Sequence, residues 1–376
     1  MAARSQLSRG TPSVNRHFLL YCLLLVMACA GAGRAHAEPY FAVQTGLKCS
    51  ACHANPTGGG LRSTFGAVWG QTALPARMLG NEGGAPWTGE ISRYLAIGTN
   101  LRAEANWIDA PNTTSASSLN VTTARLYVDL RAIPDRLSIY FDERLAPGSA
   151  NNAEAYVRLW SKDHRYYLKA GQMYLPYGLR LQDDSAFIRE QTGISFATPD
   201  RGVEFGFDGT HWVAQFAVSN GTAGGPELDK GKQWSLRSEY VSSRWRAGAS
   251  LNVNDFDAGT RRMQNLYAGL RTGPVSWLTE LDYIADGSFA TTRKQSAALL
   301  EANWNFRKGQ NLKITAEHFD PNPDLGRDQQ TRLSVVWEYT PLPFVQLRAG
   351  LRNYDDSRSI AFLNQRVAFV QLHGYF

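Results

Sequence analysis

From about residue 91 to residue 376 the sequence alternates apolar and polar residues in short runs, and clusters of Gly, Pro, Asn and Asp separate the runs. Such alternation is typical of β-strands, whose successive side chains point to opposite faces, and such clusters are typical of turns. In one run Ala249 and Leu251 share a face, whereas Ser250 and Asn252 share the other. Each expected strand therefore has one apolar and one polar face.

Sixteen such runs are found, at 91–107, 121–132, 136–145, 153–161, 164–173, 201–208, 211–219, 232–241, 243–254, 263–271, 275–285, 293–306, 310–319, 329–340, 343–353 and 365–376. Short links such as 209–210 alternate with longer polar links such as 174–200. Outer-membrane barrels have this asymmetry and, in bacteria, an even number of strands. A soluble sandwich could show the same alternation but gives no reason for the unequal links. We therefore expect an all-β fold, an antiparallel outer-membrane β-barrel of about 16 strands over 91–376, apolar toward lipid and polar toward the lumen.

The last run ends on an aromatic residue, Phe376, with Val370 and Leu372 before it on one face. A terminal aromatic residue on an amphipathic strand resembles the recognition signal of bacterial outer-membrane proteins. This resemblance implies that the barrel assembly machinery and outer-membrane lipid are partners.

Residues 1–37 have the features of a secretory signal peptide: three arginines within 1–16, an apolar run over 18–32 and the small-x-small ending Ala35-His36-Ala37. A lipoprotein site at Cys29 is the alternative, and it also predicts an exported envelope protein. Removing 1–37 takes away four arginines and no acids, so the formal charge falls from +6 to +2. The remaining chain shows no clustered basic face with interleaved aromatics, so we expect no nucleic-acid partner.

Between the signal peptide and the first strand, the sequence Cys49-Ser50-Ala51-Cys52-His53 contains Cys-x-x-Cys-His. This spacing is typical of c-type haem attachment, with two thioethers from the cysteines and the histidine as proximal iron ligand. A Cys49–Cys52 disulfide or a thiol redox pair is the alternative, but neither requires His53. We therefore expect one covalent haem c on a short segment, 38–90, that serves as a plug or periplasmic cap of the barrel. This segment is too small to bury a haem alone, so the lumen should supply walls.

The sixth iron ligand is left open between several candidates. Met78 is the only methionine in 38–90, and its alternative is ordinary apolar packing. Met173 is its rival, because the strand phase points it into the lumen. An open sixth position is also compatible with the sequence. The remaining histidines of the strands fall near strand ends or in outward phase and are expected at the surface; these are His164, His211, His318 and His373.

The string from Pro39 to Gly46, running into Cys49–His53 and then Asn55-Pro56, resembles the fused outer-membrane cytochrome-porins of iron-oxidising bacteria. The match covers about residues 39–66. The resemblance implies a monohaem segment in or under a barrel of about sixteen strands that passes electrons from an external donor to periplasmic c-type cytochromes. The chain departs from the family in its shorter length and in the run Gly58-Gly59-Gly60.

Two functions of different classes follow from these observations. The first is outer-membrane electron transfer by haem c, with a periplasmic cytochrome or other carrier as partner and iron(II) oxidation as one activity that the resemblance implies. The second is a diffusion porin whose haem segment plugs the pore or acts as a sensor. A haem peroxidase, the third possibility, would need distal acid–base groups, and no distal His motif is visible. An electron carrier is favoured over a hydrolase or transferase.

Overall fold

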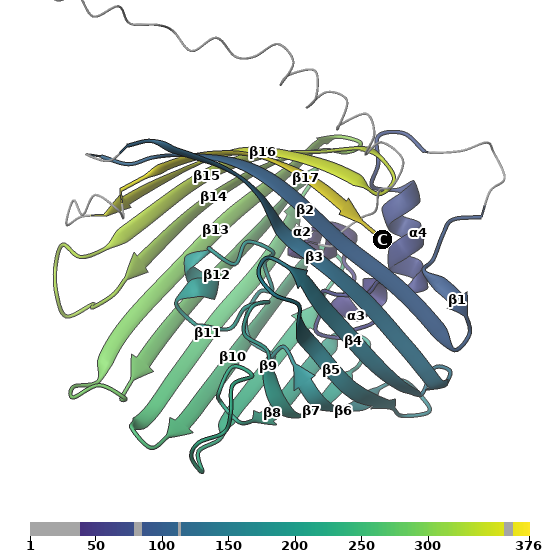
Figure 1. The fold of residues 1–376 in the computed structure, drawn as a ribbon, viewed down its shortest axis with the longest axis horizontal. Coiled ribbons are helices and arrows are strands. Elements are labelled where there is room, and N and C mark those ends of the chain that lie inside the picture. Colours follow the sequence, from purple (N-terminus) through teal and green to yellow (C-terminus); the bar gives the residue numbers. More distant parts are fainter. Residues whose placement is uncertain (1–37, 79–84, 112–113, 357–363) are drawn as a thin grey trace, which may run out of the picture.

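The computed structural model of the chain describes residues 38–78, 85–111, 114–356 and 364–376 (Figure 1). The predicted signal peptide over 1–37, and Cys29 within it, lie outside the described residues. Three short helices come first, and a sheet wound into a barrel follows. Within the described residues, no helix combines the length and apolarity needed to cross a membrane.

Sixteen antiparallel strands form a closed barrel, as the alternation predicts. Each strand from β2 to β17 pairs with its neighbours in sequence, and β17 pairs with β2 to close the ring. The strands are β2 (Leu95–Asp109), β3 (Ala116–Ile133), β4 (Leu137–Ala146), β5 (Asn151–Trp160), β6 (Tyr166–Met173), β7 (Asp200–Asp208), β8 (Trp212–Ser219), β9 (Gln233–Val241), β10 (Trp245–Phe256), β11 (Gly259–Thr272), β12 (Val275–Asp286), β13 (Arg293–Arg307), β14 (Gln310–Asp320), β15 (Gln330–Leu342), β16 (Val345–Asp356) and β17 (Arg366–Tyr375). Closure leaves no unpaired sheet edge, which is what a lipid environment demands of a sheet.

Several strand boundaries differ from the sequence prediction, and two of the differences have identifiable reasons. The run 91–107 divides into β1 (Glu90–Ser92) and β2, because the chain turns at 93–94 and β1 pairs back onto β2. The expected long link 255–262 is a tight turn, because the pairing of β10 with β11 continues to Phe256 and Gly259. Apart from the links 147–150 and 257–258, the links at that end are longer than those at the other, and they define a short-turn end and a long-loop end of the barrel.

The two faces of the barrel wall carry opposite kinds of side chain, in the phase expected for an outer-membrane barrel. Leu251 is 51% exposed and Leu351 65% exposed on the outer surface. Ser250 and Asn252, the polar partners in the same strand, are buried. Apolar side chains outside and buried polar side chains inside are the inverse of a soluble protein and fit a lipid surround.

The helices before the barrel form a plug at its short-turn end. The plug segment, 38–78, contains α2 (Pro39–Thr45), α3 (Cys49–Cys52) and α4 (Thr64–Thr72). The backbone N–H groups of Ala76 and Arg77 donate to the carbonyls of Thr340 and Pro341, where β15 turns into β16. The Gln44 carbonyl accepts a hydrogen bond of 2.7 Å from Arg271, near the turn after β11.

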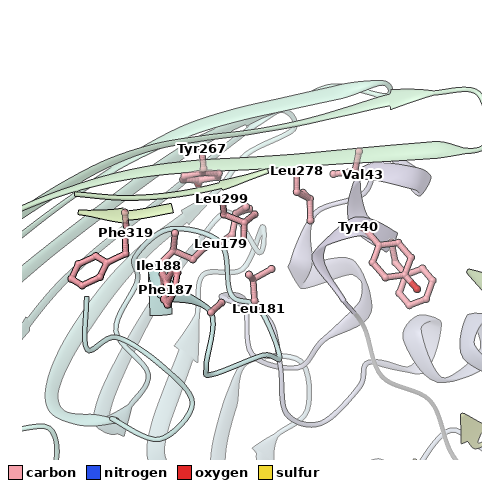
Figure 2. Packing of buried hydrophobic residues seen from close by; sticks show 13 residues of the cluster. Tyr40, Val43, Leu179, Leu181, Phe187, Ile188, Tyr267, Leu278, Leu299 and Phe319 are labelled. Atoms are coloured by element: carbon pink, nitrogen blue, oxygen red, sulfur yellow. The ribbon is translucent and has the colours of Figure 1, made fainter. Parts of the chain in front are cut away.

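A second segment enters the lumen from the opposite end. Residues 174–199, here called the inward loop, connect β6 to β7 at the long-loop end and contain α5 (Phe187–Glu190). The loop and the plug segment bury a shared apolar cluster against the barrel wall, and Figure 2 shows Tyr40 of α2, Leu179 and Phe187 of the loop, and Leu278 of β12 within it. Plug, inward loop and wall therefore pack together inside the lumen.

Candidate cofactor site in the barrel lumen

The Cys-x-x-Cys-His sequence forms a single helical turn of the plug segment. Helix α3 runs from Cys49 to Cys52, and the His53 N–H closes it by donating to the Cys49 carbonyl at 3.0 Å. Both thiols are free and half-buried. One helical turn places residues three apart on the same face, so both cysteines can serve one ligand. His53 is 6% exposed, and its Nδ1 is buried with no hydrogen-bond partner.

The electrostatics of this turn favour neutral side chains. Burial, with a smaller effect from the Arg62 cation, lowers the pKa of His53 to about 3. Burial and the neighbouring Cys49 raise the pKa of Cys52 to about 11. A neutral imidazole is the form of histidine that coordinates a metal.

The glycine run after the motif has a structural reason. Gly58, Gly59 and Gly60 all have positive φ, at 89°, 79° and 65°, a conformation that side chains disfavour. A Cβ on Gly59 would lie 2.7 Å from the Phe196 ring, and one on Gly60 would lie 2.1 Å from the Tyr140 hydroxyl. The run therefore lets the backbone fold back tightly beside α3 and against the barrel contents.

A cavity lies beside α3, between the plug segment, the inward loop and the wall. It spans about 1410 Å³ of space that protein atoms do not fill, a figure that includes space open to solvent. Its apolar lining includes Phe41, Trp69, Leu179 and Phe196, and Cys49, Cys52 and His53 border it as well. The expectation that the lumen would supply walls for a group on α3 agrees with this geometry.

Positive charge is concentrated around the cavity. Its arginines are Arg62, Arg102, Arg125, Arg180, Arg237 and Arg246. Glu239 pairs with Arg237 at 3.2 Å and with Arg246 at 2.6 Å. Arg125 pairs with Asp142 at 2.8 Å. The other three arginines form no ion pair with a carboxylate in the described part of the chain.

A buried polar network fixes the plug segment to the wall opposite this site. Nδ2 of Asn55 donates to both carboxylate oxygens of Glu154, at 3.1 and 3.0 Å. The same carboxylate accepts the Tyr174 backbone N–H at 3.0 Å, and Lys169, beside Asn55, pairs with Glu204 at 3.1 Å. Asn55, Glu154, Lys169 and Glu204 are all fully buried. One carboxylate of β5 thus holds both the plug segment and the inward loop.

The two methionines proposed as sixth ligands do not border the cavity. Met78 is 63% exposed, at the end of the described plug segment. Met173 does point into the lumen, as its strand phase predicts, but it packs in a separate cluster with Leu61, Tyr140 and Tyr156. The structure therefore places neither methionine on the lining of the cavity that His53 borders.

One histidine departs from the expected surface position. His373 is fully buried, and its Nδ1 lies 3.0 Å from the Gln346 side-chain oxygen. Its neighbours explain this, because Val370 is exposed on the outer face and residue 373 falls in the opposite phase of the same strand. His373 does not border the cavity. His164, His211 and His318, by contrast, are not buried.

The residues present fit a c-type haem better than a protein-only metal site. Within the described residues, no three His, Cys, Asp or Glu side chains cluster closely enough to hold a metal ion. The observations that fit haem c are two free cysteines on one helical turn, a buried histidine with an unpartnered ring nitrogen, and a large cavity against all three. Cys49 and Cys52 would carry the group, and His53 would be its proximal ligand.

Comparisons with known proteins identify the fold. No protein-family model and no curated protein matches the sequence. Among solved structures, an OmpT loop-deletion mutant of Vibrio cholerae superposes with a TM-score of 0.59 at 12% identity, over 75% of this chain and 99% of that one. An anion-selective porin from Comamonas acidovorans gives 0.59 at 11% identity, over 75% and 99%. The channel DcaP of Acinetobacter baumannii gives 0.58 at 13% identity, over 75% and 97%.

The chain thus has the closed 16-strand barrel fold of outer-membrane porins. At these identities the similarity establishes the fold alone, because a fold can host many unrelated functions.

Proposed function

We propose that this chain is a bacterial outer-membrane barrel that carries one covalent haem c inside its lumen and transfers electrons across or at the membrane. The observation that carries the proposal is the position of the Cys-x-x-Cys-His turn, which borders a cavity of about 1410 Å³ within a closed barrel. The motif alone predicts attachment, and the cavity gives the attached group a site shielded by protein on several sides.

The chain's own residues have distinct roles in this proposal. Cys49 and Cys52 tether the group, and His53 offers a neutral imidazole to the iron. Phe41, Trp69 and Leu179 line the cavity and limit contact with water. When bound, haem c supplies a one-electron couple whose potential depends on its ligands, its hydrogen bonds and its burial.

The placement of the site within the barrel bears on its partners. The plug segment is bound at the short-turn end, which in outer-membrane barrels faces the periplasm. The hydrocarbon core is about 30 Å thick, a long distance for one haem to bridge. A periplasmic c-type cytochrome at the short-turn end is therefore the proposed partner, and an external compound such as iron(II) is the proposed donor.

A diffusion porin whose haem segment plugs the pore or acts as a sensor is the second candidate. The comparisons favour it, since solved structures similar to this chain include a porin and an outer-membrane channel. The lumen contents favour electron transfer, since the plug segment and the inward loop are packed against each other and the wall inside the barrel. Conductance of the wild-type protein in a planar bilayer separates the two, because a filled lumen should conduct poorly.

The deciding experiment is a redox-titrated visible spectrum with the intact mass of wild type, Cys49→Ala, His53→Ala and the matched control Ser50→Ala on the same helical turn. We expect a covalent haem in wild type and the control, loss of one thioether in the cysteine variant, and altered iron ligation in the histidine variant. Reduction of oxidised wild type by iron(II), with low conductance, would support electron transfer. A wild-type mass without haem would refute the proposal.

A further inference from the structure

Three arginines beside the cavity carry positive charge without an acidic partner. Arg62, Arg102 and Arg180 border the cavity, and in the described part of the chain none lies within ion-pair distance of a carboxylate. Arg62 instead lies 5.0 Å above the Tyr375 ring. An isolated cation withdrawn from water is costly, and proteins compensate such charges with counter-charges. Arg180 also lies 5.4 Å from the centroid of the Tyr174 ring. Arg102 and Arg180 both hydrogen-bond to the inward loop, and an anionic partner for this pair is expected in the cavity.

Arg180 belongs to the inward loop, and Arg102 of β2 contacts the same loop two residues further on. Nη2 of Arg102 donates to the Gln182 side-chain oxygen at 2.6 Å, and its Nε is buried with no partner. Arg180, two residues before Gln182, donates from Nη1 to the Thr57 hydroxyl at 2.6 Å and to the Gly58 carbonyl at 3.1 Å. Nη2 of Arg180 donates to the Leu175 carbonyl at 3.1 Å. All these acceptors are neutral oxygens, so no carboxylate in direct contact neutralises either guanidinium, although Glu154 and Glu204 act on Arg180 from farther away.

The shape and lining of the cavity favour one kind of anion. A small free anion would need a compact polar site, whereas this cavity is large and mixes aromatic and aliphatic walls with charge. A flat apolar ring system with carboxylates on one edge matches both features. Haem has this chemistry, because its two propionates lie on one edge and its thioether positions are elsewhere on the ring.

We propose that Arg102 and Arg180 bind the two carboxylates of the ring group that Cys49 and Cys52 hold, and so fix its orientation in the lumen. This inference rests on the proposed function for the identity of the group. Guanidinium groups bind carboxylates in a planar, bidentate geometry that lysine does not reproduce. The inward loop thereby becomes part of the cofactor site, through Arg180 directly and through Gln182, which holds Arg102.

The test separates carboxylate binding from covalent attachment. Protein carrying Cys49→Ala and Cys52→Ala is titrated with metal-free protoporphyrin IX and with its dimethyl ester, and binding is followed by quenching of tryptophan fluorescence. A hydrogen bond to a charged group contributes enough that the free diacid should bind about tenfold or more tightly than the ester. Adding Arg102→Gln and Arg180→Gln should abolish this preference.

Arg189→Gln is the matched control, because Arg189 is a buried arginine of the same loop, donates to the Leu179 carbonyl at 3.0 Å and does not border the cavity. It should leave the preference intact. Equal binding of diacid and ester by protein with both arginines would overturn the inference, as would a preference that survives their replacement. Inorganic phosphate that protects the protein thermally through these arginines, with no preference between the porphyrins, would also overturn it in favour of a free-anion site. A wild-type chain without covalent haem would instead refute the proposed function, and the porphyrin titration would still decide the carboxylate site.

Discussion

Replacing Asn55 tests how firmly the plug segment is fixed in the barrel. Asn55→Ala removes both hydrogen bonds to Glu154, at 3.1 and 3.0 Å, and the 2.9 Å bond from the Thr57 hydroxyl. Hydrogen bonds to a charged group contribute about 1.5–3 kcal/mol, and a buried acceptor left without its donor adds to the loss. We therefore expect local opening of the plug segment to become easier by about 3 kcal/mol.

Hydrogen exchange measures this opening directly. A change of 3 kcal/mol corresponds to a fall in amide protection on the order of 100-fold, observable at the Leu61 N–H, which donates to the Tyr140 hydroxyl at 2.9 Å. Asn120→Ala is the control, because the Asn120 side chain is exposed and donates to the Ser118 hydroxyl, away from the plug segment. Unchanged protection at Leu61 in Asn55→Ala would refute the reasoning that this buried network holds the plug. Equal loss in the control would show that the effect is not specific.

Three further outcomes are expected. Gly60→Ala should lower the free energy of unfolding by more than about 1 kcal/mol, because φ is 65° and the new Cβ would meet the Tyr140 hydroxyl at 2.1 Å. Denaturation of the variant beside wild type measures this difference, and equal stability would contradict the expectation. Met78→Leu should leave the visible spectrum of the covalent haem unchanged, since Met78 is exposed outside the cavity; a ligand-field change would show that it reaches the iron. Burial opposes the shift, but the Arg332 cation lowers the pKa of Asp183 below its usual value. This ion pair therefore stabilises the inward loop fully at any pH above the unfolded pKa of about 3.9. Its contribution is lost only as the pH falls through the lower pKa of the folded state. Protease resistance of the loop at pH 5 should then match that at pH 7 in wild type and be reduced at both in Asp183→Asn, and resistance of the variant equal to wild type would contradict this.

The barrel could be predicted from the sequence because its signals are local. Alternation at a period of two and turn residues between runs set the strands, and the phase of each strand sets its lumen face. Met173 illustrates this success: its inward direction follows from phase alone, and the structure buries it in the lumen. His373 follows from the same phase, although its nearness to the strand end suggested a surface position.

The arrangement inside the lumen could not be predicted in the same way, because it depends on contacts between residues far apart in sequence. Asn55 meets Glu154 and Arg180 meets Thr57, pairs separated by 99 and 123 positions. No period or motif marks such partners. The sequence predicted a long polar link at 174–200, but not that Arg180 would border the cavity beside Cys49.

Under the proposed function, the placement of α3 also sets an order of events during biogenesis. Cys49 and Cys52 lie inside a closed ring of strands, with the plug segment fastened to the turns at one end and the inward loop packed over the cavity from the other. An enzyme that joins a cofactor to both sulfurs must reach them while the segment is still extended. Under the proposed function, cofactor attachment in the periplasm therefore precedes the pairing of β17 with β2, and the barrel then closes around a plug that already carries its cofactor.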